Sequence, residues 1–134
     1  MFVVSAHAAD YVWRSGGVIA KYIEEGAEVH VVVLSYGVCG ESNDLWNIPG
    51  LTAEEVKSIR KRETEKAADI LGIKSIEYWD LPDYPIHFTE FEVNRLVRKM
   101  REINSDILVS HDKYDIMNPA AWRHPGVATC NAET

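Results

Sequence analysis

The chain has 134 residues, of which 46% are hydrophobic and 26% are charged, as in an ordinary soluble domain with one modest core. Its formal net charge of −7 argues against nonspecific binding to nucleic acid or to an anionic membrane, because both need a basic surface. An anionic small-molecule substrate would need a local cationic pocket.

Neither export nor membrane insertion is predicted, because the sequence shows no charged-then-apolar leader and no apolar run near 18 residues. The two cysteines, Cys39 and Cys130, lack Cys-x-x-Cys spacing, which suits a reducing compartment. We therefore expect a cytoplasmic protein.

Strand and helix signals alternate from the start of the chain. Residues 2–6 predict a short apolar strand, and residues 11–25 predict a helix that Gly26 ends. Residues 28–35 contain a β-branched run that is typical of a buried parallel strand. The predicted inward face of the helix consists of Val12, Gly16, Ile19, Ala20 and Ile23.

A long loop with Gly and Asn, residues 36–51, precedes the second predicted helix. Thr52 is a suitable N-cap, and Glu55 completes a capping box. The helix then continues to Gly72. Its predicted inward face consists of Val56, Ile59, Ala67 and Ile70.

Residues 73–79 predict a third strand, and residues 106–110 a fourth. Between them, Thr89 and Glu92 form a second capping box before a helix that reaches Ile103. The predicted inward face of that helix consists of Val93, Leu96, Val97, Met100 and Ile103. This order of elements predicts an α/β fold with a mainly parallel sheet and helices on both faces, in one domain over residues 1–134.

Ligands of such sheets bind outside the carboxyl ends of the strands. The four segments that follow the strands begin at His7, Tyr36, Asp80 and His111, and they hold nearly all the chemically suggestive residues. A dinucleotide site is not expected, because the glycine pair at 16–17 lacks the Gly-x-Gly-x-x-Gly fingerprint.

His7 and Asp10 lie where the first strand meets the first helix. An imidazole and a carboxylate within one turn of chain can converge on a metal ion. The alternative is a surface His beside a helix-capping Asp, and the spacing by itself leaves both open.

The stretch from residue 3 to 17 resembles the Ala-His-Pro-Asp-Asp…Gly-Gly opening of the PIG-L/LmbE zinc deacetylase family. The resemblance implies a Rossmann-like three-layer α/β/α fold and zinc bound by His7 and Asp10. Ala8 and Ala9 replace the proline and the aspartate that serves as general base. The match is more detailed for the 4-oxalomesaconate hydratases of aromatic-acid degradation. Their pattern fits Ser5, Ala6, His7, Ala9, Asp10, Val12, Trp13, Arg14, Gly16 and Gly17.

Glu41 follows the second strand in a segment with Gly37 and Gly40, which would let the backbone approach a ligand closely. The hydratases have a similar Gly-x-x-Gly-Glu-Ser segment, which implies proton transfer by Glu41. Since Ala9 cannot accept a proton, acid/base chemistry here needs a second carboxylate. The alternative is a solvated loop glutamate.

The resemblance implies a third zinc ligand in the last loop, where the hydratases resemble Asn-Pro-Asp-His-Pro. Here Asn118-Pro119 and His124-Pro125 match the two ends of the motif, but four residues separate them where one is expected. We expect His124 to be the third ligand, with His111 as the alternative. Three protein ligands and one open position form a catalytic zinc site.

Arg14 and Asp83 are the candidates for substrate binding. Arg14 lies one helical turn beyond Asp10 and could pair with a substrate carboxylate, although an exposed helix cation is the alternative. Asp83 resembles the acid that the family keeps after its third strand, although an Asp between prolines also stabilises turns. Arg60, Arg62 and Glu63 match a family cluster, for which we expect ion pairing within the helix and from the helix to a loop.

The resemblance covers residues 2–125, whereas members of the family run well beyond 200 residues, so we expect an apparently truncated domain. It implies a zinc-dependent hydratase of an unsaturated oxo-tricarboxylate. The alternatives are an N-deacetylase of an N-acetylglucosamine conjugate and an inactive metal-binding remnant that binds a partner. Four parallel strands without the rest of the sheet would leave an apolar edge, so homo-oligomerisation or poor solubility is expected.

Overall fold

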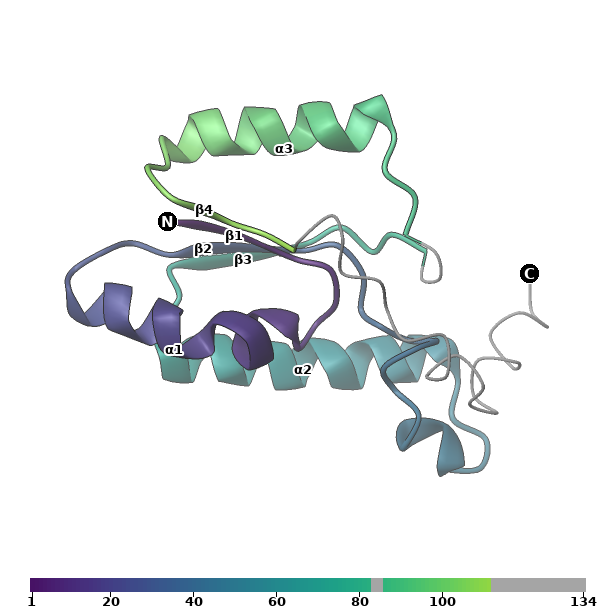
Figure 1. Cartoon of the computed structure of the whole chain (residues 1–134). Coiled ribbons are helices and arrows are strands. Elements are labelled where there is room, and N and C mark those ends of the chain that lie inside the picture. Colours follow the sequence, from purple (N-terminus) through teal and green to yellow (C-terminus); the bar gives the residue numbers. More distant parts are fainter. Residues whose placement is uncertain (83–85, 112–134) are drawn as a thin grey trace.

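The computed structural model describes residues 1–82 and 86–111, in which a parallel four-stranded sheet lies between two layers of helices (Figure 1). The strands are β1 (Phe2–Ser5), β2 (His30–Val33), β3 (Ser75–Tyr78) and β4 (Leu108–Val109). The helices are α1 (Asp10–Glu24), α2 (Ala53–Leu71) and α3 (Glu90–Ile103), with a short 3₁₀ helix, η1 (Leu45–Asn47). The predicted three-layer α/β/α fold is confirmed.

The order of the strands in the sheet is β3-β2-β1-β4. Val3 of β1 therefore pairs with Val31 of β2 on one side and with Val109 of β4 on the other. The chain builds the sheet outward from β1 to β3 and then crosses back to place β4 beside β1. The strand order thus reverses between β1 and β4, and ligands of open α/β sheets bind at such a reversal.

Successive strand residues face opposite sides of the sheet and separate two apolar layers. Val3, Val31 and Val33 pack with Tyr11 and Ile19 on the face that α1 and α2 cover. Phe2, Val32, Leu34 and Trp79 pack on the α3 face, with Leu96, Met100 and Ile103 of α3 against them. Among the described residues, no helix is long and apolar enough to cross a membrane.

Side chains fix the helix ends as predicted. Thr52 and Glu55 form a capping box at the start of α2, and Thr89 and Glu92 form another at the start of α3. Gly72 ends α2 with φ +79°, a left-handed conformation that glycine adopts without a steric penalty. The boundaries of α2 and α3 therefore follow from local chemistry.

The predicted buried faces of the helices are wrong in part. Tyr11 of α1 is fully buried although it was not predicted to be, and Val12 is 38% exposed, whereas Ile19 is fully buried as predicted. Ile70 of α2 is 86% exposed, while Thr64 and Ala68 are buried. The apolar pattern misplaced this face because it treats threonine as an exposed polar residue. The hydroxyl of Thr64 instead donates to the carbonyl of Arg60 within α2, which allows the side chain to be buried.

The outer part of the apolar stripe on α3 also departs from expectation. Val93 and Val97 are exposed, whereas Leu96 contacts the core. Among the described residues α3 is the only helix on its face of the sheet, so no neighbouring helix covers Val93 and Val97.

Candidate metal centre

The turn between β1 and α1 brings His7 and Asp10 together. The backbone N–H of His7 donates to Oδ2 of Asp10 at 2.9 Å, and Asp10 is the first residue of α1. Both side chains are buried. A carboxylate at the first turn of a helix is also favoured by the helix dipole. This local hydrogen bond therefore holds the imidazole and the carboxylate on the same side of the turn.

Glu41 reaches the same place from the loop after β2. Gly37 turns this loop with φ +71°, and its carbonyl accepts hydrogen bonds from the backbone N–H of Glu41 at 3.2 Å and from Oγ of Ser42 at 2.8 Å. A Cβ atom on Gly37 would lie 3.2 Å from Cβ of Glu41 and 3.4 Å from Cβ of His7. The absence of a side chain at Gly37 therefore allows Glu41 to approach His7.

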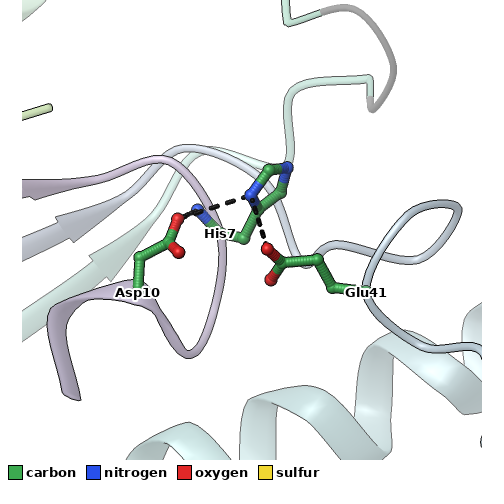
Figure 2. A group of neighbouring side chains, drawn as sticks. All are labelled: His7, Asp10 and Glu41. Carbon is green, nitrogen blue, oxygen red and sulfur yellow. Dashed lines mark hydrogen bonds and ion pairs between the residues drawn. The ribbon is translucent and has the colours of Figure 1, made fainter. Parts of the chain in front are cut away.

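His7, Asp10 and Glu41 form a compact group of donors (Figure 2). Nδ1 of His7 lies 3.4 Å from Oδ2 of Asp10 and 3.3 Å from Oε1 of Glu41. One ligand atom from each residue lies within 4.8 Å of the others. Ligands about 2.0–2.1 Å from a tetrahedral zinc are about 3.4 Å apart. The nitrogen and oxygen donors of this group thus fit a metal ion of that kind.

The surroundings of Asp10 favour the charged form of its carboxyl group. Its burial raises the pKa, but the side-chain and backbone hydrogen bonds with His7 and the charges of His7 and His111 outweigh that effect. The pKa of the Asp10 carboxyl is therefore lowered from its ordinary value, and the carboxylate form that a metal ion requires is favoured.

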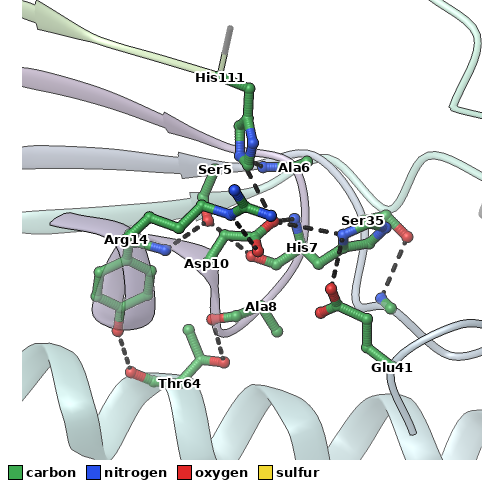
Figure 3. A network of polar contacts seen from close by, with 12 residues as sticks. Ser5, Ala6, His7, Ala8, Asp10, Arg14, Ser35, Glu41, Thr64 and His111 are labelled. Atoms are coloured by element: carbon green, nitrogen blue, oxygen red, sulfur yellow. Dashed lines mark hydrogen bonds and ion pairs between the residues drawn. The ribbon is translucent and has the colours of Figure 1, made fainter. Parts of the chain in front are cut away.

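His111 lies at the carboxyl end of β4 and joins the site from the other side of β1 (Figure 3). Its Nε2 accepts the backbone N–H of Ala6 at 3.0 Å and lies 3.5 Å from Oδ2 of Asp10. The lone pair of Nε2 is engaged by this N–H group. The alternative third ligand is thus next to the site, but it orients the backbone of Ala6 there.

Arg14 also lies at the site. Its Nε is 3.5 Å from Oδ1 of Asp10, and its side chain remains 52% exposed. A hollow of about 160 Å³ between α1 and the ends of β1 and β4 is lined by Arg14, Ser15, Ser110 and His111, among others. A cationic side chain therefore borders the centre, as expected for a substrate-binding group, while its binding role stays a prediction.

Other predicted residues lie elsewhere. Asp83 and His124 are outside the described residues, so their roles as substrate-binding residue and third ligand stay predictions. Asp80, which opens the segment after β3, pairs with Lys57 at 2.9 Å. Arg60 pairs with Glu63 on α2 at 3.1 Å, as the expectation of intrahelical ion pairing requires.

Two buried hydroxyls support the site, although neither was assigned a role from the sequence (Figure 3). Oγ of Ser5 donates to the carbonyl of His7 at 2.7 Å, and Oγ1 of Thr64 lies 3.2 Å from the carbonyl of Ala8. The sequence feature that could have indicated Ser5 is its hydroxyl at the end of an otherwise apolar strand, two residues before the candidate ligand His7.

The chain is similar in sequence to two enzymes that differ in activity. A 4-oxalmesaconate hydratase from Pseudomonas putida KT2440 is 42% identical over 123 residues, which are 92% of this chain and 46% of that enzyme. A probable N-acetyl-alpha-D-glucosaminyl L-malate deacetylase 2 from Bacillus anthracis is 29% identical over 82% of this chain and 49% of its own length.

Solved structures have the same fold. The 4-carboxy-2-hydroxymuconate hydratase of Pseudomonas putida KT2440 superposes with a TM-score of 0.80 at 39% identity, over 98% of this chain and 55% of that one. The N,N'-diacetylchitobiose deacetylase of Pyrococcus horikoshii gives 0.75 at 25% identity, over 93% and 43%. The chain thus spans about half the length of these relatives. The family described as PIG-L, GlcNAc-PI de-N-acetylase, matches residues 2–128, and the chain belongs to this family.

Proposed function

We propose that the chain carries the zinc-binding part of a hydratase that adds water to the carbon–carbon double bond of 4-oxalomesaconate, an unsaturated oxo-tricarboxylate formed when gallate or protocatechuate is degraded. The observation that carries this proposal is the 42% identity to a 4-oxalmesaconate hydratase over 92% of the chain.

Ala9 supports hydration over amide hydrolysis. It occupies the position at which the resemblance to the deacetylases implies an aspartate base, and its methyl group cannot accept a proton. A hydratase needs its proton-transfer group in a different place, beside the double bond. Glu41 offers a carboxylate that is 29% exposed and lies against His7.

Each residue has a defined role in this proposal. His7 and Asp10 hold the zinc ion, with His124 as the third ligand. Zinc bound there would polarise a substrate carbonyl or carboxylate and stabilise developing enolate charge. Glu41 accepts a proton from the attacking water, and the partial exposure of its carboxylate supports this role. Arg14 pairs with a carboxylate of the substrate, because a guanidinium forms bidentate hydrogen bonds with that group.

The setting of the activity is part of the same proposal. The substrate is a small anionic molecule, and neither nucleic acid nor a membrane is a partner, in keeping with the net charge of −7. The enzyme works in the cytoplasm, and copies of the chain associate into a homo-oligomer. Asp83 contributes to binding of the substrate.

An N-deacetylase of an N-acetylglucosamine conjugate is the second candidate. The observation that favours it is the 29% identity to a probable deacetylase over 82% of the chain. It would require Glu41 to replace the missing base at Ala9. A third candidate is an inactive metal-binding remnant that binds a partner.

Loss of 4-oxalomesaconate, followed by its ultraviolet absorbance, tests the main proposal. We expect hydration by a version of the chain that is extended with the carboxyl-terminal half of the Pseudomonas putida hydratase. In the 134-residue chain, which spans 46% of that hydratase, hydration should be weak or undetectable. Release of amine from an N-acetylglucosamine conjugate without hydration would instead favour the deacetylase.

A further inference from the structure

Ser5 lies at the end of β1 and is buried, at 1% exposure, yet it offers no charged or nitrogen ligand to a metal. Its hydroxyl donates to the carbonyl of His7 at 2.7 Å and accepts the backbone N–H of Tyr11 at 3.1 Å. A serine hydroxyl has one proton to donate, and Ser5 gives it to His7. The side chain therefore joins the candidate ligand to the first turn of α1.

The bond to Tyr11 replaces a missing helix cap. The first backbone N–H groups of a helix have no partner within the helix, and a side chain at the N-cap commonly accepts one of them. Ala9 is the N-cap of α1 and makes no such bond. Ser5, which lies before the turn, accepts the N–H of Tyr11 instead.

The hydrogen bond from Ser5 also holds the backbone of His7. The N–H of His7 donates to Oδ2 of Asp10, while its carbonyl accepts from Ser5. Both backbone polar groups of the candidate ligand are therefore held by side chains, and one of these side chains is the other candidate ligand. Without the Ser5 hydroxyl, the carbonyl of His7 and the N–H of Tyr11 would lose these buried partners.

We propose that Ser5 is the positioning residue of the metal site: its hydroxyl presets the turn from residue 5 to 11 so that His7 and Asp10 meet one metal ion. This inference rests on the proposed zinc site. Removal of a group that orients metal ligands typically weakens metal affinity 10- to 100-fold.

The test compares Ser5→Ala with a matched control. Tyr11→Phe removes a similarly buried hydroxyl, on α1, that donates to the carbonyl of Thr64 at 2.7 Å and not to that of His7. Zinc affinity is measured by competition with a chromogenic chelator, and folding by circular dichroism. We expect Ser5→Ala to raise the zinc Kd at least about tenfold, and Tyr11→Phe to change it less than about twofold.

A conservative variant distinguishes a positioning role of Ser5 from a contribution to the stability of the fold. Ser5→Thr keeps the hydroxyl and should retain zinc affinity, even if its added methyl group lowers the melting temperature. If Ser5→Ala lowers the melting temperature as Tyr11→Phe does but binds zinc like the unaltered chain, Ser5 is only a structural residue and the inference is wrong.

Hydrogen exchange of the backbone amide of residue 11 tests the role of Ser5 independently of the proposed zinc site. If the unaltered chain binds no zinc, the proposed zinc site fails, and Ser5 is judged in the metal-free protein. Exchange should then be at least about tenfold faster in Ser5→Ala than in Tyr11→Phe, because only the first change removes the acceptor of that N–H. Equal rates would overturn the positioning role.

Discussion

Nδ1 of His7 lies 3.3 Å from Oε1 of Glu41, although the two residues follow different strands. The parallel pairing of β1 with β2 brings the carboxyl ends of both strands to one edge, and the loop from Gly37 then turns back toward β1. Asp10 lies on the other side of the imidazole, 3.4 Å away. A histidine between two carboxylates is thus the centre of the site.

Zinc binding should depend on His7 and Asp10. We expect about one zinc per chain in the purified protein and little in a His7→Ala, Asp10→Ala double variant, because a site that lacks two ligands binds zinc poorly. The metal content is measured by elemental analysis. A matched control changes His30 and Glu28 to Ala, a histidine and carboxylate pair 4.0 Å apart at the other end of the strands. Equal zinc in all three proteins would contradict the site.

Gly37 should be required for the approach of Glu41 to His7. Gly37→Ala places a methyl group 3.2 Å from Cβ of Glu41 and strains a backbone with φ +71°. Gly50→Ala introduces the strain alone, since φ is +80° there and no atom lies within 4 Å of the added Cβ. Both variants should lose about 1–2 kcal/mol in the free energy of unfolding.

The comparison of these two variants isolates crowding at the site. In the extended chain, hydration should fall at least about tenfold in Gly37→Ala and change little in Gly50→Ala, because displacement of a catalytic group by 1 Å has a large effect on rate. Equal rates in the two variants would show that Glu41 does not need its observed position.

Glu77 should stabilise α3 on the sheet at neutral pH. Burial raises the pKa of its carboxyl, but hydrogen bonds from Lys99, Arg95 and Trp79 outweigh this, and the pKa is lowered. A lowered pKa in the folded state gives stability that is present above the unfolded pKa, about 4.3, and is lost as the pH falls through the folded value.

Glu77→Gln should therefore lower the free energy of unfolding at pH 7 by about 1 kcal/mol or less, since the side chain is 34% exposed and its ion pairs are screened by solvent. Urea unfolding at pH 7 and at pH 3 measures the difference, which should shrink toward zero at the lower pH. Glu102→Gln, at an exposed position of α3, is the control and should have no such pH-dependent effect.

The sequence predicted those parts of the fold that depend on local chemistry. Thr52 with Glu55, and Gly72, fix the ends of α2 through adjacent backbone groups, so the residue types alone indicate them. His7 and Asp10 are likewise close in sequence and in space. The buried face of α2 could not be read in this way, because Thr64 is buried against the turn at Ala8, whose carbonyl lies 3.2 Å from its hydroxyl, and only the packed structure supplies this contact. The hydroxyl of Ser5 bonds to His7 and Tyr11, which are near in sequence, but residue types alone do not indicate the turn that brings these groups to it.

Amide hydrolysis should be absent. Ala9 leaves the deacetylase position without a proton acceptor, so neither this chain nor its extended version should release amine from N-acetylglucosamine conjugates or from N,N'-diacetylchitobiose. Released amine is measured with a fluorescent reagent, and a deacetylase of the family serves as the positive control. Robust turnover would overturn the hydratase proposal and indicate that Glu41 replaces the missing base.

The last prediction distinguishes a proton-transfer role of Glu41 from metal ligation, since its distance to His7 is compatible with both. Glu41→Gln keeps an oxygen and nearly the same volume but removes the ability to accept a proton at neutral pH. If the carboxylate transfers protons, hydration by the extended chain should fall about 10²- to 10⁴-fold while the zinc Kd changes less than about threefold. If it is a ligand, the zinc Kd of Glu41→Gln should rise as it does for Asp10→Asn, which serves as the matched comparison. A variant with unchanged rate and unchanged zinc affinity would exclude both roles and leave Glu41 as a loop residue that merely lies beside the site.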